Sequence, residues 1–124
     1  MAQVSLILGA LGGLFAVALG AFGAHALRAR LDDYSLRIFE TAVQYQFFHS
    51  LGLLAVGLLL LRFPDSALLR ANGWLFLIGI GLFSGSLYVL SLSGLRWLGA
   101  ITPLGGLAFV AGWGCMAAAC WKLL

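Results

Sequence analysis

The side chains of this sequence that could carry chemistry are few, and they lie around the end of one apolar segment and the start of the next. His25 ends the first long apolar segment, inside the glycine-rich run 20–27. The next apolar segment opens with a carboxylate, a hydroxyl, an amide, a phenol and a second imidazole: Glu40, Thr41, Gln44, Tyr45 and His49. Titratable groups beside apolar segments are rare and often functional. These residues together with His25 form the candidate polar cluster.

The spacing within this cluster leaves three interpretations open. Thr41, Tyr45 and His49 are four residues apart and share one helix face, and Glu40 and Gln44 share a neighbouring face. The cluster could be hydrogen-bonded and structural, with both histidines neutral. It could handle protons or a solute, because histidine titrates near neutral pH. It could also bind a metal, with two histidines and one glutamate as ligands.

The motifs of enzymes and cofactor sites are not found in the sequence. It has no His-x-x-x-His or Cys-x-x-Cys spacing, no nucleophile beside a base and an orienting group, and no glycine-rich phosphate loop with lysine. We therefore expect no catalytic residues, no cofactor and no metal. A membrane enzyme that depends on a metal or on protons remains an alternative.

Composition indicates that the solvent of this chain is lipid. Of its 124 residues, 63% are hydrophobic and only 9% are charged, whereas soluble domains have roughly 25% charged residues. The net charge of +3 comes from cations spread over short connections. Such a distribution suits anchors against lipid headgroups and does not suit a nucleic-acid surface. We expect an all-α integral membrane protein with no nucleic-acid partner.

Four apolar segments of about 20 residues each have the length that crosses a hydrocarbon core of about 30 Å. They must be helices, because lipid cannot satisfy exposed backbone groups. The sequence thus predicts a single transmembrane domain, 1–124, folded as a four-helix bundle with both termini on one side. The expected helices cover residues 4–24, 41–61, 73–92 and 98–121. Arginine and lysine are divided almost equally between the two sides, so the orientation stays open.

Two places along the chain allow alternative helix boundaries. Within 27–40, helical spacing is followed by Leu27, Leu31, Tyr34 and Ile38, which predicts either an interfacial helix or an extension of the second span. A helix there would be capped by one of the two aspartates at 32 and 33. Pro103 marks either a ragged start of the fourth helix or a kink within it.

Small residues recur at helical spacing, which lets helix backbones approach closely in lipid. This spacing predicts packing within the bundle, and the alternative is that one stripe forms the face of a homo-oligomer. The expected packing positions are Gly9, Gly13, Gly20, Gly23, Gly81, Gly85, Gly105, Gly106 and Gly112.

In the fourth segment, Trp113 lies far from either end. Its indole N–H needs a partner there, which we expect to be a polar residue of another helix. Cys115 and Cys120 are five residues apart on that same helix, too far for a disulfide, and are interpreted as small packing residues.

Four motifs in order resemble a known family. They are Gly20–Leu27, Thr41–Leu51, Thr102–Gly106 and the pair Gly112-Trp113. Together they resemble the bacterial family called domain of unknown function 423, with eukaryotic relatives in the transmembrane protein 256 family. Ala26 stands where glycine is expected. The resemblance implies a small four-helix protein of the inner membrane and implies no activity. The matching residues to test are His25, Gln44, Tyr45, His49 and Trp113.

The sequence therefore predicts an integral membrane protein of unknown biochemical activity. We expect a structural or accessory subunit of a larger membrane complex, or a small homo-oligomer, in contact with the lipid bilayer of the bacterial inner membrane. The alternative is a small transporter or channel component that uses the candidate polar cluster.

Overall fold

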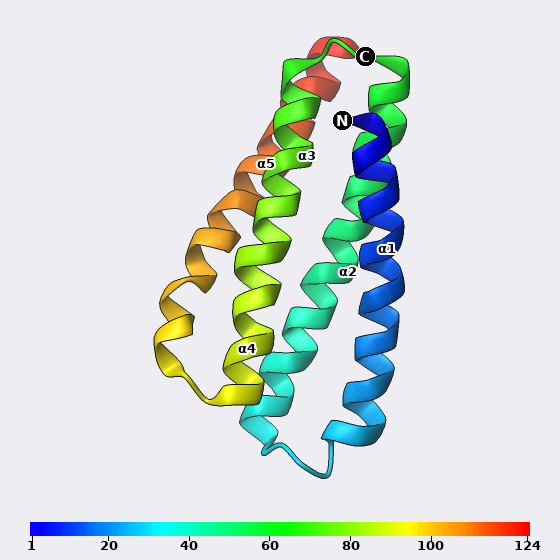
Figure 1. Ribbon diagram of the computed structural model, residues 1–124. Helices are drawn as coiled ribbons and strands as arrows, with labels where there is room; N and C mark the ends of the chain where they lie inside the picture. Colours follow the sequence, from blue (N-terminus) through cyan, green and yellow to red (C-terminus); the bar gives the residue numbers. More distant parts are fainter.

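The computed structural model describes all residues 1–124, and helices make up nearly the whole chain (Figure 1). In chain order the elements are α1 (Ala2–Phe22), a π-helical turn (Gly23–Leu27), α2 (Asp33–Arg62), α3 (Ala67–Gly79), a second π-helical turn (Ile80–Ser84), α4 (Gly85–Ser93), a 3-10 turn (Arg96–Ala100) and α5 (Thr102–Leu123). They combine into 4 spans that are long and apolar enough to cross a membrane: Ala2–Leu27, Asp33–Arg62, Ala67–Ser93 and Arg96–Leu123. The predicted all-α membrane bundle is confirmed.

The spans form two antiparallel pairs (Figure 1). One pair is α1 with α2, and the other is α3–α4 with α5. Helix α2 is central, because it contacts α1 on one side and α3 and α4 on the other. Both termini lie at the end of the molecule where α2 connects to α3, as an even number of spans requires.

Helix α2 is one continuous helix that begins earlier than residue 41. Asp32 caps it by accepting a hydrogen bond of 2.7 Å from the backbone N–H of Ser35. The polar residues from 33 to 40 therefore extend the second span. With 30 residues the helix is about 45 Å long, which exceeds the hydrocarbon core of about 30 Å. Its ends must protrude into the headgroups or the helix must tilt.

The third and fourth spans also begin earlier than expected. The third starts at Ala67 instead of residue 73, because Ser66 caps it by accepting from the N–H of Leu69 at 3.3 Å. The fourth starts with the 3-10 turn, and Pro103 lies in the first turn of α5. A proline is tolerated there because the first N–H groups of a helix have no partner within it. Pro103 therefore marks a ragged start of the fourth helix and not a kink within it.

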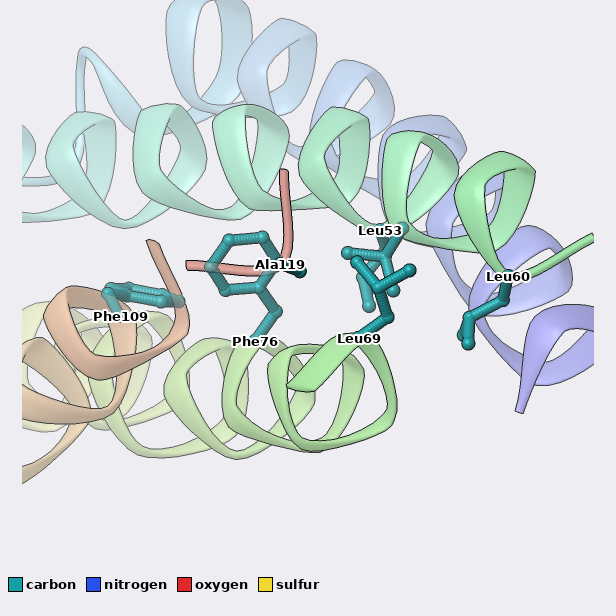
Figure 2. Packing of buried hydrophobic residues seen from close by; sticks show 7 residues of the cluster. Leu53, Leu60, Leu69, Phe76, Phe109 and Ala119 are labelled. Carbon is teal, nitrogen blue, oxygen red and sulfur yellow. The ribbon is translucent and has the colours of Figure 1, made fainter. Parts of the chain in front are cut away.

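The main hydrophobic core lies between α2, α3 and α5, toward the end that carries the termini (Figure 2). It consists of Leu53, Val56, Leu60, Leu69, Phe76, Phe109 and Ala119. A smaller core at the other end joins α2, α4 and the 3-10 turn through Ala42, Leu87, Leu90 and Leu98. These two cores hold α2 against four other elements and so position the polar residues that lie between them.

Glycines allow the closest helix contacts, although at partly different positions from those expected. A Cβ at Gly9 would lie 2.9 Å from the carbonyl oxygen of Ser50, and a Cβ at Gly23 would lie 2.8 Å from the Phe39 ring. Expected glycines that pack tightly against another helix are Gly9, Gly20, Gly23, Gly105 and Gly112. Unexpected ones that do so are Gly12, Gly52, Gly57, Gly73 and Gly79.

The other expected glycines make no close contact with another helix in this chain. A Cβ at Gly13 or Gly81 would meet nothing within 4 Å. At Gly85 and Gly106 the nearest atoms would be at ordinary contact distance, 4.0 and 3.9 Å. On α1 the reason is the helical period of about 3.6 residues. The face of α1 that contacts another helix passes through Gly9, Gly12 and Ala16, at intervals of three or four residues. A strict four-residue spacing therefore leaves this face at Gly13.

Candidate functional site

His49 is buried near the middle of α2 and both its ring nitrogens have partners. Nδ1 lies 2.7 Å from the carbonyl oxygen of Tyr45, which can only accept, so Nδ1 carries the proton and donates it. Nε2 accepts from the indole N–H of Trp113 on α5 at 3.0 Å. Trp113 thus has its partner on another helix, and His49 is a neutral imidazole in this arrangement.

Aromatic rings enclose this histidine. Its ring stacks on Phe109 with centroids 3.5 Å apart and planes 11° apart, and it meets Phe76 edge-on at 5.2 Å. Tyr45, one turn earlier, lies against Phe83 at 4.5 Å. The rings come from α2, α3, the π-helical turn 80–84 and α5, so the imidazole sits where the second, third and fourth spans meet.

Gln46 forms a second buried polar site and links three spans. Its Nε2 donates to the carbonyl oxygen of Gly12 on α1 at 2.8 Å, and its Oε1 accepts from the hydroxyl of Tyr88 on α4 at 2.6 Å. The Ser50 hydroxyl donates to the Gln46 carbonyl oxygen at 2.7 Å, one turn along α2. The amide therefore has both its oxygen and its nitrogen engaged inside the chain.

Three more polar contacts join the third span to the second and the fourth. Asn72 on α3 donates through Nδ2 to the carbonyl oxygen of Gly112 on α5. The Ser84 hydroxyl donates to the carbonyl oxygen of Ala42 at 2.8 Å. The hydroxyls of Ser86 on α4 and Thr102 on α5 are hydrogen-bonded at 2.6 Å. The second span is thus joined by side-chain hydrogen bonds to each of the other three, and the third and fourth spans are joined to each other.

The candidate polar cluster is not brought together in one place. His25, Glu40 and Gln44 are exposed on the outside of the bundle, and no hydrogen bond of their side chains is present. Thr41 donates to the carbonyl oxygen of Arg37 on its own helix at 2.9 Å. Only Tyr45 and His49 lie together, with ring centroids 6.0 Å apart.

Sequence reasoning missed Gln46 and Asn72, the two amides that are buried. The signal for Gln46 was its position four residues after Ala42 and three before His49, which puts the three on one face of α2. The signal for Asn72 was a lone amide in a long apolar stretch, four residues before Phe76.

Two open grooves lie on the sides of the bundle. The α2–α5 groove has a volume of about 640 Å³ and is lined by residues that include Tyr45, His49, Phe109 and Trp113. The α1–α2 groove has a volume of about 470 Å³. Its lining includes Ala16, Gly20, Ala21, Gln44 and Phe48. Both grooves lie along apolar spans, so hydrocarbon is the medium that they meet.

Charged groups lie at the ends of the spans. One end carries Arg28, Arg30, Arg37 and Arg96, and the other end carries Arg62, Arg70 and Lys122. The backbone N–H of Ser35 holds the pKa of Asp32 below its usual value, because it donates to the ionised carboxylate. No three of the His, Cys, Asp and Glu side chains are placed so that they could hold a metal ion together.

The chain is similar to known proteins over most of its length. A family model described as "Protein of unknown function (DUF423)" matches residues 19–106. UPF0382 membrane protein YwdK of Bacillus subtilis is 49% identical over 111 residues, which cover 90% of each chain. A UPF0382 membrane protein of Haemophilus influenzae is 47% identical over 108 residues, 87% of this chain and 86% of the relative. No solved structure matches.

Proposed function

The chain belongs to the DUF423 family of unknown function, and we propose that it is a non-catalytic structural or accessory subunit of a membrane assembly. It is an integral membrane protein of the bacterial inner membrane, surrounded by the lipid bilayer. The assembly in this proposal contains either its own copies or another membrane protein.

The observation that carries the proposal is the pairing of His49 with Trp113. A proton carrier needs a nitrogen that is free to accept a proton, but the free electron pair of His49 Nε2 already accepts from Trp113. Protonation there would replace an attractive contact by two opposed N–H groups. Gln46 is engaged in the same way between α1 and α4. These two buried side chains therefore link helices, which suits a rigid structural component.

Purification of the native protein from its own membranes in a mild detergent tests the proposal. We expect a particle that contains a second polypeptide, or further copies of this chain, in a fixed ratio. The measurement is native mass spectrometry, combined with identification of every polypeptide present. A homogeneous monomer without a constant companion contradicts the proposal.

A small transporter or channel component is the second candidate, and one observation favours it. The α2–α5 groove reaches His49 from the side of the bundle, so a solute could approach the imidazole there. Purified protein in liposomes is assayed for proton and solute flux, and Trp113→Phe is the matched variant because it keeps an aromatic ring and removes the N–H. Flux by the wild type that changes in Trp113→Phe, with the fold intact, supports transport. Absence of flux from both supports the structural role.

A further inference from the structure

Gln44 is a polar side chain that the fold of a single chain leaves without a partner. It is exposed on α2, and its amide makes no hydrogen bond within the chain. Its neighbour Val43 lies against Gly20 of α1, where a glycine Cβ would come within 3.3 Å of the valine side chain. Gly20 lies seven residues before the end of the first span at Leu27, about 10 Å along a helix axis. Gln44 is therefore at a depth where hydrocarbon surrounds the bundle.

An amide in hydrocarbon without hydrogen bonds is unfavourable, because lipid chains offer neither donors nor acceptors. In membranes such side chains bond across helices and promote association. The amide of Gln44 carries donors and an acceptor at once. Another amide complements both at once, since two identical amides related by a twofold axis can each donate to the other.

The surface beside Gln44 is shaped for a close contact. The α1–α2 groove of about 470 Å³ is lined by the small residues Ala16, Gly20 and Ala21. Phe48 lines the same groove, and its side chain is 53% exposed. A hollow, a projecting ring and an unpaired amide thus lie on one face, which is what an interface between identical surfaces requires.

The spans also differ in how much of each is buried, and the least buried one borders the α1–α2 groove. In the first span only 17% of an apolar stretch of 18 residues is buried, whereas 44% of the corresponding stretch is buried in the second span. Helix α1 is thus the span with the most uncovered surface, and the groove runs along it.

We propose that the α1–α2 groove is the contact face between two copies of this chain, with the Gln44 amides of the two copies hydrogen-bonded to each other. This inference rests on the proposed function and names the partner as a second copy. Phe48 of each copy lies in the groove of the other. The small residues at the groove allow the backbones to approach closely enough for the amides to meet.

Disulfide cross-linking in native membranes tests which face two copies share. Cys115 and Cys120 are replaced by alanine, and a single cysteine is introduced by Ala21→Cys at the groove. The matched control is Val110→Cys on α5, whose side chain is 71% exposed on another face. We expect covalent dimers with Ala21→Cys and far fewer with Val110→Cys. The opposite pattern, or no dimer from either, overturns the inference.

The contribution of the amide is tested by Gln44→Leu and Gln44→Asn, with dimerisation followed by energy transfer between labelled copies in liposomes. We expect Gln44→Leu to raise the dimer dissociation constant roughly three- to thirtyfold, the range for polar contacts between helices in membranes. Gln44→Asn keeps an amide and should lose less. An unchanged dissociation constant in Gln44→Leu overturns the amide pairing.

The same experiments separate failure of this inference from failure of the proposed function. If the chain forms no dimer with itself but purifies in a fixed ratio with a different protein, the inference is overturned and the proposed function is kept. A chain that associates with nothing overturns both. A monomer in which Gln44 reaches the lipid headgroups belongs to this last outcome.

Discussion

Two glutamines two residues apart on α2 have opposite surroundings. Gln46 is buried, with 7% of its side chain exposed, and its amide bonds to α1 and to α4. Gln44 lies on the outside of the bundle and bonds to neither. Residues two positions apart in an α-helix are separated by about 200° around the helix axis. The same chemical group therefore joins the chain to itself on one face of α2 and lacks a partner on the other.

The difference shows that in this protein the helix face decides what a polar side chain does. On the inner face of α2, a polar group contributes by linking helices that have no hydrophobic drive to associate in lipid. On the outer face, an identical group gives a single chain no stability and can be satisfied only from outside. Stability and association should therefore separate when the two faces are changed one at a time.

Gln46→Leu should have the largest effect of the changes considered. Two hydrogen bonds disappear, each worth about 1 kcal/mol, and the Tyr88 hydroxyl and the Gly12 carbonyl lose their partner, so the expected destabilisation is about 3 kcal/mol. The measurement is equilibrium unfolding in mixed micelles. A loss of less than about 0.5 kcal/mol, the usual effect of a surface change, would show that the inner face is not held by this amide.

Gly105→Ala and Gly81→Ala extend the comparison from polar groups to backbone contacts. A Cβ at Gly105 would collide with the backbone of Phe83, which cannot rotate away, whereas a Cβ at Gly81 would meet no atom within 4 Å. We expect Gly105→Ala to cost about 2 kcal/mol, the typical cost of overpacking. Gly81→Ala should be neutral or stabilising by a few tenths of a kcal/mol, since alanine favours the helix. Equal stabilities of the two variants, measured in the same micelles, would contradict this assignment of faces.

The fold was predictable from the sequence because length and apolarity determine a membrane span directly. Four segments of the required length predict the bundle without knowledge of any contact. The start of α3 was not predicted, since Ser66 extends this helix to Ala67 by capping it, and the start of α2 was predicted only as one of two alternatives, with a cap at Asp32 or Asp33. Capping is a local interaction that hydropathy does not report.

The site was less predictable because it depends on which face of a helix turns inward. Thr41, Tyr45 and His49 follow helical spacing, but the inward face of α2 passes through Ala42, Gln46 and His49. Only His49 belongs to both sets. In an apolar segment nearly every face looks hydrophobic, so spacing alone cannot identify the inner one. The contacts with α1 and α4 determine it, and those come from the fold.

Asp32 and Asp33 are a third matched pair, at the start of α2. Asp32 accepts from the N–H of Ser35, which lowers its pKa, whereas Asp33 lies inside the first turn. A carboxylate whose pKa is lowered by folding stabilises the helix end above its unfolded pKa of about 4, and this contribution is lost as the pH falls through the lower native value. We expect hydrogen exchange at the Ser35 amide, corrected for its intrinsic rate, to accelerate below about pH 4.

The matched variants for this pair are Asp32→Ala and Asp33→Ala. Asp32→Ala should show accelerated exchange at Ser35 at neutral pH and lose the acid dependence, because the acceptor is gone. Asp33→Ala should retain the wild-type profile. The same profile in both variants would mean that the two carboxylates are interchangeable as caps.

Gln44→Leu should have the smallest effect on the stability of the single chain. The amide makes no hydrogen bond that the substitution could remove, and leucine is at least as favourable as glutamine in a helix. In dilute micelles, where copies are separated, we expect a change within about 0.5 kcal/mol, as for other surface positions. A loss comparable to that of Gln46→Leu would mean that Gln44 turns inward, and the contrast between the two faces would fail. A near-zero change in the monomer, together with weaker self-association in liposomes, would assign Gln46 to the fold and Gln44 to the contact between copies, because a group that contributes nothing to one chain can affect dimerisation only through the other.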